Sequence, residues 1–138
     1  MTLHLHLQIV GALLFVLGLS HTCFVRFFGW KRELPRLSLF TRQVFEVHCF
    51  FIALLLLLLG LLSFCCAGAL LEPGPLSRAL LAGMAAFWTC RLAVQIFVYK
   101  PEIWRGRTFY TAMHVLFTAF WVYAAGTYSL ALRSVWRG

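Results

Sequence analysis

Charged side chains are scarce in this chain of 138 residues. Only 12% of the residues are charged, 62% are hydrophobic, and just four are acidic. An ordinary soluble domain has about twice this charged fraction, and a chain of this size could not bury so much apolar surface in water. The scarcity excludes a separate water-phase enzyme module. It indicates a single transmembrane domain covering residues 1–138.

Motifs that would assign a chemistry are also missing. The five cysteines show no CxxC spacing, and no HxxxH or ExxH pair occurs within a helix, so ligand spacing predicts no metal site. The cysteines are expected to pack as small apolar side chains. The first six residues contain no Lys or Arg, and no small-residue cleavage pattern follows the first apolar segment. That segment is therefore expected to be a retained helix and not a cleaved signal peptide.

What the chain does contain is four apolar segments, each long enough to cross a bilayer, which takes roughly 20 helical residues. They cover about residues 7–28, 44–70, 76–99 and 109–132. Short connections make sequential helices pack antiparallel. The sequence thus predicts an all-α fold, an integral membrane four-helix bundle with up-down-up-down topology.

The basic residues are distributed unevenly between the connections. The first and third loops hold most of them, and the opposite side holds few: Arg26, Lys31, Arg32, Arg36, Arg42, Lys100, Arg105 and Arg107 against Arg78, Arg133 and Arg137. Positive-inside asymmetry predicts cytoplasmic first and third loops and external termini, as in a bacterial inner membrane. The loops are expected to contact lipid headgroups of the bilayer, and no nucleic acid partner is expected, because no water-exposed basic face with stacking aromatics is present.

Ionisable side chains lie inside the apolar segments. His21, His48 and His114 each lie roughly 8–11 Å beyond the cytoplasmic basic residues, at about 1.5 Å per helical residue. Arg91 lies slightly deeper, and Gln95 lies at the depth of the histidines. Such groups are costly in hydrocarbon and usually face a bundle interior. These five residues are predicted to line a buried polar site in the cytoplasmic half of the bundle.

Helical spacing places these residues on shared faces with other polar or small residues. Glycines on such a face would let membrane helices approach closely. The three stripes are Gln8, Gly11, Gly18 and His21; Trp88, Arg91 and Gln95; and Thr111, His114 and Thr118.

Several ligands suit this lining. Two imidazoles on facing helices would ligate a haem, with Arg91 paired to a propionate, or His and Gln side chains would hydrogen-bond the oxygens of a quinone or a similar lipophilic ligand. Imidazoles also suit metal ions, but Arg91 would repel a bare cation. In the alternative without a ligand, each histidine bonds a neighbouring helix or extends towards the headgroups. A haem or quinone site is the leading prediction.

Two other classes of function stay open. The chain would also suit a non-catalytic accessory or scaffold subunit, whose polar groups bond a membrane-protein partner or a second copy of the chain. The third class is a small membrane enzyme acting on a lipophilic substrate. No catalytic motif distinguishes this last class.

Two stretches resemble small uncharacterised four-helix bacterial membrane proteins. They are Trp30–Leu34 leading to Leu39–Phe45, and Arg91–Phe97. The resemblance implies the fold but no activity, and it draws attention to Glu33, Arg42, Gln43, Arg91 and Gln95.

A weaker resemblance is to the four-helix membrane enzymes that use glutathione in eicosanoid metabolism. Arg91 matches their third-helix arginine, and Arg107-Thr108 matches a later Arg-Ser/Thr pair. Their second-helix signature, an arginine followed by asparagine and glutamate, is absent, since the chain reads Arg42-Gln43-Val44 there. The resemblance implies a site that faces the cytoplasm.

Overall fold

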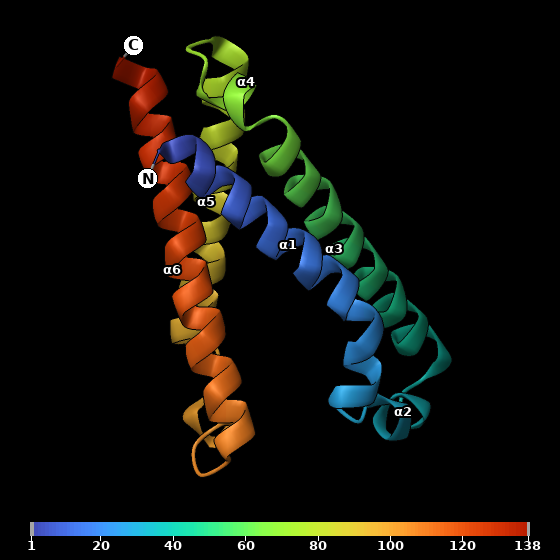
Figure 1. Cartoon of the computed structure of the whole chain (residues 1–138). Coiled ribbons are helices and arrows are strands. Elements are labelled where there is room, and N and C mark those ends of the chain that lie inside the picture. The colour runs from blue at the N-terminus through green and yellow to red at the C-terminus, as the bar shows by residue number, and fades with distance from the viewer. Residues whose placement is uncertain (1, 138) are drawn as a thin grey trace. The chain divides into compact units, whose positions relative to one another are not determined.

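The structure is a computed structural model that describes residues 2–137, without the side chains at positions 25–27 and 31. Arg26 and Lys31 of the predicted basic loop are therefore outside the described side chains. All regular secondary structure within 2–137 is helical. The long helices are α1 (Leu3–Phe27), α3 (Leu39–Cys65), α5 (Pro75–Phe97) and α6 (Thr108–Arg137). All four are long and apolar enough to cross a membrane, which confirms the predicted all-α class with four long apolar helices (Figure 1).

Short helices occupy the connections. They are α2 (Trp30–Glu33), η1 (Leu34–Arg36), α4 (Ala67–Leu71) and η2 (Pro101–Ile103). The chain breaks at Cys66, so the segment expected at 44–70 consists of most of α3 followed by α4. Ser38 begins α3 as its N-cap, because its Oγ accepts a hydrogen bond of 3.2 Å from the backbone N–H of Thr41.

The chain divides into two compact units. The first, the α1/α3 unit, covers Gln8–Cys66. The second, the α5/α6 unit, contains residues 67–137 together with the start of α1, residues 2–7. Each unit holds one antiparallel pair of long helices.

Glycine backbones form the contact between α1 and α3. A Cβ atom on Gly11 would lie 2.7 Å from the carbonyl oxygen of Gly60, and a Cβ on Gly60 would lie 2.8 Å from that of Gly11. Further along α1, a Cβ on Gly18 would lie 2.8 Å from the Cγ of Leu57. Only glycine permits this approach. The close approach predicted at Gly11 and Gly18 is confirmed, and Gly60 is its partner on α3.

The α5/α6 pair packs larger side chains against small ones. Leu81 and Trp88 of α5 are fully buried, as are Ala124, Tyr128 and Ala131 of α6. Small residues such as these alanines let membrane helices approach closely. His6, in the first turns of α1, belongs to this unit because its Nδ1 lies 2.8 Å from the hydroxyl of Tyr123.

Candidate functional site: a donor-rich polar cluster on α5 and α6

A chain of hydrogen bonds joins three of the five predicted site residues. An Nη1–H of Arg91 donates to Oε1 of Gln95, at 3.1 Å, one turn along α5. Nε2 of Gln95 lies 2.9 Å from Nδ1 of His114 on α6. Gln95 is only 4% exposed, so its amide lies between the two helices. The structure thus brings Arg91, Gln95 and His114 together in one polar cluster, in which Gln95 is buried and the other two are half-buried.

The direction of these bonds follows from the chemistry of their ends. A guanidinium has only donors, so Gln95 must present its oxygen to Arg91. The amide NH₂ group of Gln95 then donates to His114, whose Nδ1 must accept. A histidine that accepts through Nδ1 is neutral and carries its proton on Nε2. The Arg91–Gln95 pair therefore fixes His114 as a donor through Nε2–H.

Aromatic rings surround this cluster. The ring of Trp104 stacks on His114 with a centroid distance of 4.6 Å and an angle of 9°. The guanidinium of Arg91 lies 4.8 Å from the ring centre of Trp121 and 5.7 Å from that of Tyr99. A cation over an aromatic face gains about 0.5–2 kcal/mol, depending on its burial, which offsets part of the cost of placing the half-buried Arg91 within the span.

Almost every free polar atom here is a donor. The indole N–H groups of Trp88, Trp104 and Trp121 are buried and have no hydrogen-bond partner within residues 2–137. The hydroxyls of Thr111 and Thr118 already donate to backbone carbonyls. The groups of the cluster that lack a partner are therefore N–H donors, beside one positive charge.

Arg91 also has no carboxylate beside it among the described side chains. The ion pair among the described side chains lies elsewhere, on α3, where Nε of Arg42 is 3.9 Å from Oε1 of Glu46. Arg91 is half-buried, and a charge that is partly removed from water without a counter-charge carries a desolvation cost. A ligand with acceptor oxygens would complete the cluster, whereas another donor or a bare cation would not.

The other two predicted residues, His21 and His48, lie in the α1/α3 unit. The Nδ1–H of His21 donates to the carbonyl of Leu17, and that of His48 donates to the carbonyl of Val44, each at 2.8 Å. His48 is exposed, and it lies about 120–140° around α3 from Ala53 and Gly60, which face α1. The described structure shows no contact between these two rings, and the three-histidine layer stays a prediction.

Metal binding was expected to be the weaker interpretation. Within residues 2–137, no three His, Cys, Asp or Glu side chains gather closely enough to hold a metal ion.

Sequence reasoning placed Trp88 on the stripe of Arg91 and Gln95 but missed the other rings of the cluster. Trp121 follows His114 by two helical turns, so helical phase would have placed it beside the site as well. Trp104 gave no such signal, because it lies in the irregular connection between α5 and α6. Its position is fixed by Thr111, whose hydroxyl donates to the Trp104 carbonyl at 2.7 Å.

Comparison with protein-family models, with curated proteins and with solved structures gave no match. The chain is described by its architecture, a small protein with four long apolar helices. Its polar cluster has to be interpreted from its own chemistry.

Proposed function

We propose that this integral membrane protein binds a lipid-soluble ligand with acceptor oxygens, a quinone, at the cluster of Arg91, Gln95 and His114. The observation that carries the proposal is the donor-rich character of the cluster. A quinone carries two carbonyl acceptors on a flat apolar ring and a hydrocarbon tail. It can accept hydrogen bonds from Arg91 and from Nε2–H of His114 while the tail stays in the bilayer.

The aromatic side chains support the same class of ligand. Trp104 already stacks on His114 at 4.6 Å, and Trp88 stacks on Trp121 at 5.2 Å with an angle of 9°. Parallel ring systems of this kind are suited to a further flat ring. The unpartnered indole N–H groups add donors that carbonyl oxygens would satisfy.

Haem is the second candidate, and one observation favours it elsewhere in the chain. His21 and His48 each donate from Nδ1 to a backbone carbonyl, which leaves Nε2 free as a ligand for iron. His114 has the opposite tautomer, because its Nε2 carries the proton. Iron ligation by His114 would require the Gln95 bond to be broken. Haem would thus depend on His21 and His48 of the α1/α3 unit and would not use His114.

Placement in a bacterial inner membrane, with external termini and the basic first and third loops in the cytoplasm, is part of this proposal. The proposal also includes a single transmembrane domain and kinship with small bacterial four-helix proteins. An accessory subunit, or an enzyme acting on a lipophilic substrate, would use the same cluster. These two alternatives differ from simple quinone binding by a copurifying partner or by turnover.

Purified protein in detergent micelles tests the proposal through three measurements. The lipid extract is analysed for quinone, the absorption spectrum is searched for haem, and a short-tailed benzoquinone is titrated while tryptophan fluorescence is recorded. We expect the benzoquinone to quench the fluorescence at saturation. Arg91→Gln should weaken this binding about tenfold or more, because hydrogen bonds to charged groups are strong.

The matched control is Arg105→Gln, which removes the same charge from an exposed loop residue. It should leave the benzoquinone affinity unchanged. Equal affinity in the wild type and Arg91→Gln, or no saturable binding together with a quinone-free extract, would overturn the proposal. A haem band in place of quinone would support the second candidate.

A further inference from the structure

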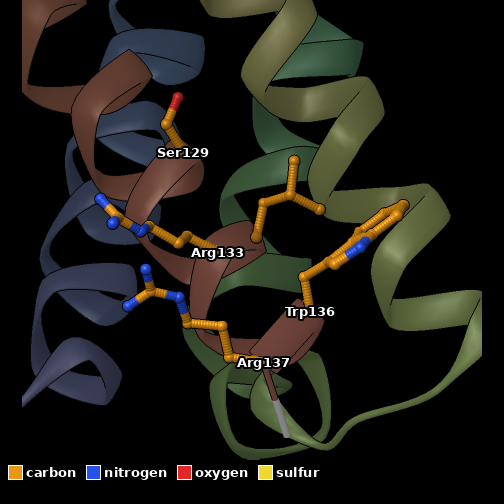
Figure 2. A pocket seen from close by; sticks show the side chains of 5 residues that line it. Ser129, Arg133, Trp136 and Arg137 are labelled. Atoms are coloured by element: carbon orange, nitrogen blue, oxygen red, sulfur yellow. The ribbon is translucent and has the colours of Figure 1, made fainter.

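The C-terminal part of α6 contains a hollow distinct from the polar cluster, with a volume of about 290 Å³. Its wall combines basic, apolar and hydroxyl side chains within one helix. Figure 2 shows this lining, in which the guanidinium groups of Arg133 and Arg137 extend on the same side of the helix. The lining residues are Ser129, Leu132, Arg133, Trp136 and Arg137.

Arg133 and Arg137 are one helical turn apart, where like charges repel each other. Both are exposed. Within residues 2–137, neither has a carboxylate or a hydrogen-bond partner. An anion placed between them would turn this repulsion into two charge-assisted contacts.

Arg78 of α5 adds a third positive charge at this end and fixes the aromatic wall. Its Nε–H donates to the carbonyl of Val135, at 3.2 Å, and its guanidinium lies 5.6 Å from the ring centre of Trp136. This contact holds the indole on the side of the hollow opposite the guanidiniums of Arg133 and Arg137 (Figure 2). The wall of the hollow therefore has a fixed position in the α5/α6 unit.

The hollow also has the polarity of a membrane interface. It lies at the end of the candidate span Thr108–Arg137, with Leu132 about one turn towards the apolar part of α6. Tryptophan and arginine are typical of the headgroup level, and leucine is typical of the acyl level below it. A ligand that fits both levels is amphiphilic.

We infer that this hollow binds an anionic phospholipid, independently of the proposed quinone site. The phosphate group bridges the guanidiniums of Arg133 and Arg137, and the hydroxyl of Ser129 lies within the same lining. The first part of an acyl chain runs along Leu132 and the indole of Trp136. A zwitterionic phospholipid binds less tightly, because its ammonium group is repelled by the two arginines of the lining.

Brominated lipids test this inference, since bromine quenches tryptophan fluorescence at short range. Full-length protein in detergent micelles is titrated with dibrominated phosphatidylglycerol or dibrominated phosphatidylcholine. The contribution of Trp136 is the difference between the wild type and Trp136→Phe. We expect the anionic phosphatidylglycerol to quench this contribution at lower concentrations than the zwitterionic phosphatidylcholine does.

The variant Arg133→Gln/Arg137→Gln should lower the affinity for the anionic lipid, measured by quenching of Trp136, by about fivefold for each arginine removed. The matched control is Lys100→Gln/Arg105→Gln, which removes two exposed charges near the other end of the α5/α6 pair. It should retain the wild-type affinity for the anionic lipid. If the double variant fails to fold, as judged by its helical circular dichroism, Arg137→Gln alone serves, with a fivefold loss expected.

Three results would overturn the inference. They are equal quenching by the two lipids, unchanged affinity after loss of the arginines, and displacement of the lipid by inorganic phosphate at equal concentration. The last would indicate a simple anion site. Retained quinone binding in Arg133→Gln/Arg137→Gln would show that the two sites are separate.

Discussion

The amide of Gln95 donates to Nδ1 of His114 across the contact between α5 and α6, at a distance of 2.9 Å. The same amide accepts from Arg91 through its oxygen, so it cannot turn around without placing donor against donor. One glutamine therefore determines which nitrogen of a membrane-embedded histidine carries the proton. The ligand class proposed for the site depends on that proton.

The tautomer of His114 can be tested by replacing Gln95. Gln95→Glu presents acceptors to both neighbours, so the proton of His114 should move to Nδ1 and leave Nε2 as an acceptor. Imidazole ¹⁵N chemical shifts distinguish the two forms. We expect Nε2–H in the wild type and Nδ1–H in Gln95→Glu, with His21 as an internal control that has Nδ1–H in both proteins. Wild-type His114 protonated at Nδ1 would contradict the assignment.

Loss of the amide should also reduce stability. Gln95→Leu leaves Arg91 and His114 without their partner between the helices, and a buried polar group left unpaired costs about 1–3 kcal/mol. Unfolding in mixed detergent micelles measures the difference. Gln43→Leu, at an exposed position of α3, is the matched control and should change the free energy of unfolding little. Equal loss in both variants would contradict a specific role for Gln95.

The glycine contact of the α1/α3 unit gives a second stability prediction. Gly11→Ala places a methyl group 2.6 Å from the backbone nitrogen of Phe64, so the helices must separate. Overpacking of this kind costs about 1–3 kcal/mol. Gly83→Ala is the control, because a Cβ there meets nothing within 4 Å, and it should be neutral or slightly stabilising. Unfolding midpoints of the two variants check this, and a Gly11→Ala protein as stable as Gly83→Ala would be inconsistent with the contact.

The N-cap of α3 is testable in the same way. Ser38→Ala removes the acceptor for the N–H of Thr41 and should cost about 1 kcal/mol. Ser38→Asp keeps an acceptor and should retain most of the stability. Thermal unfolding followed by circular dichroism compares the three proteins, and identical midpoints for Ser38→Ala and the wild type would show that the cap contributes nothing.

The sequence was most informative where a single physical rule dominates. Apolar length predicted the four long helices, because a helix has to satisfy its own backbone in hydrocarbon. The glycine spacing predicted the face of α1 that meets α3, and helical phase placed Arg91, Gln95 and His114 on polar stripes.

Apolar length and helical phase do not predict which side chains of two different helices come into contact. Depth alone grouped His114 with His21 and His48, whereas the contacts that fix His114 come from Gln95 and Trp104. The position of Trp104 depends on the path of an irregular loop, and the partner of Gly11 depends on helix register. Both are set by packing, which hydropathy does not encode.

The most direct measurement of the central claim is the infrared carbonyl stretch of a ¹³C-labelled short-tailed benzoquinone added to the purified protein. Hydrogen bonds from Arg91 and His114 should lower this frequency for the bound molecule relative to the molecule in empty micelles. Arg91→Gln should lose part of the shift, and Arg105→Gln should keep it. A bound quinone with the frequency of the free molecule, or no bound quinone, would contradict the assignment of this cluster as a quinone site.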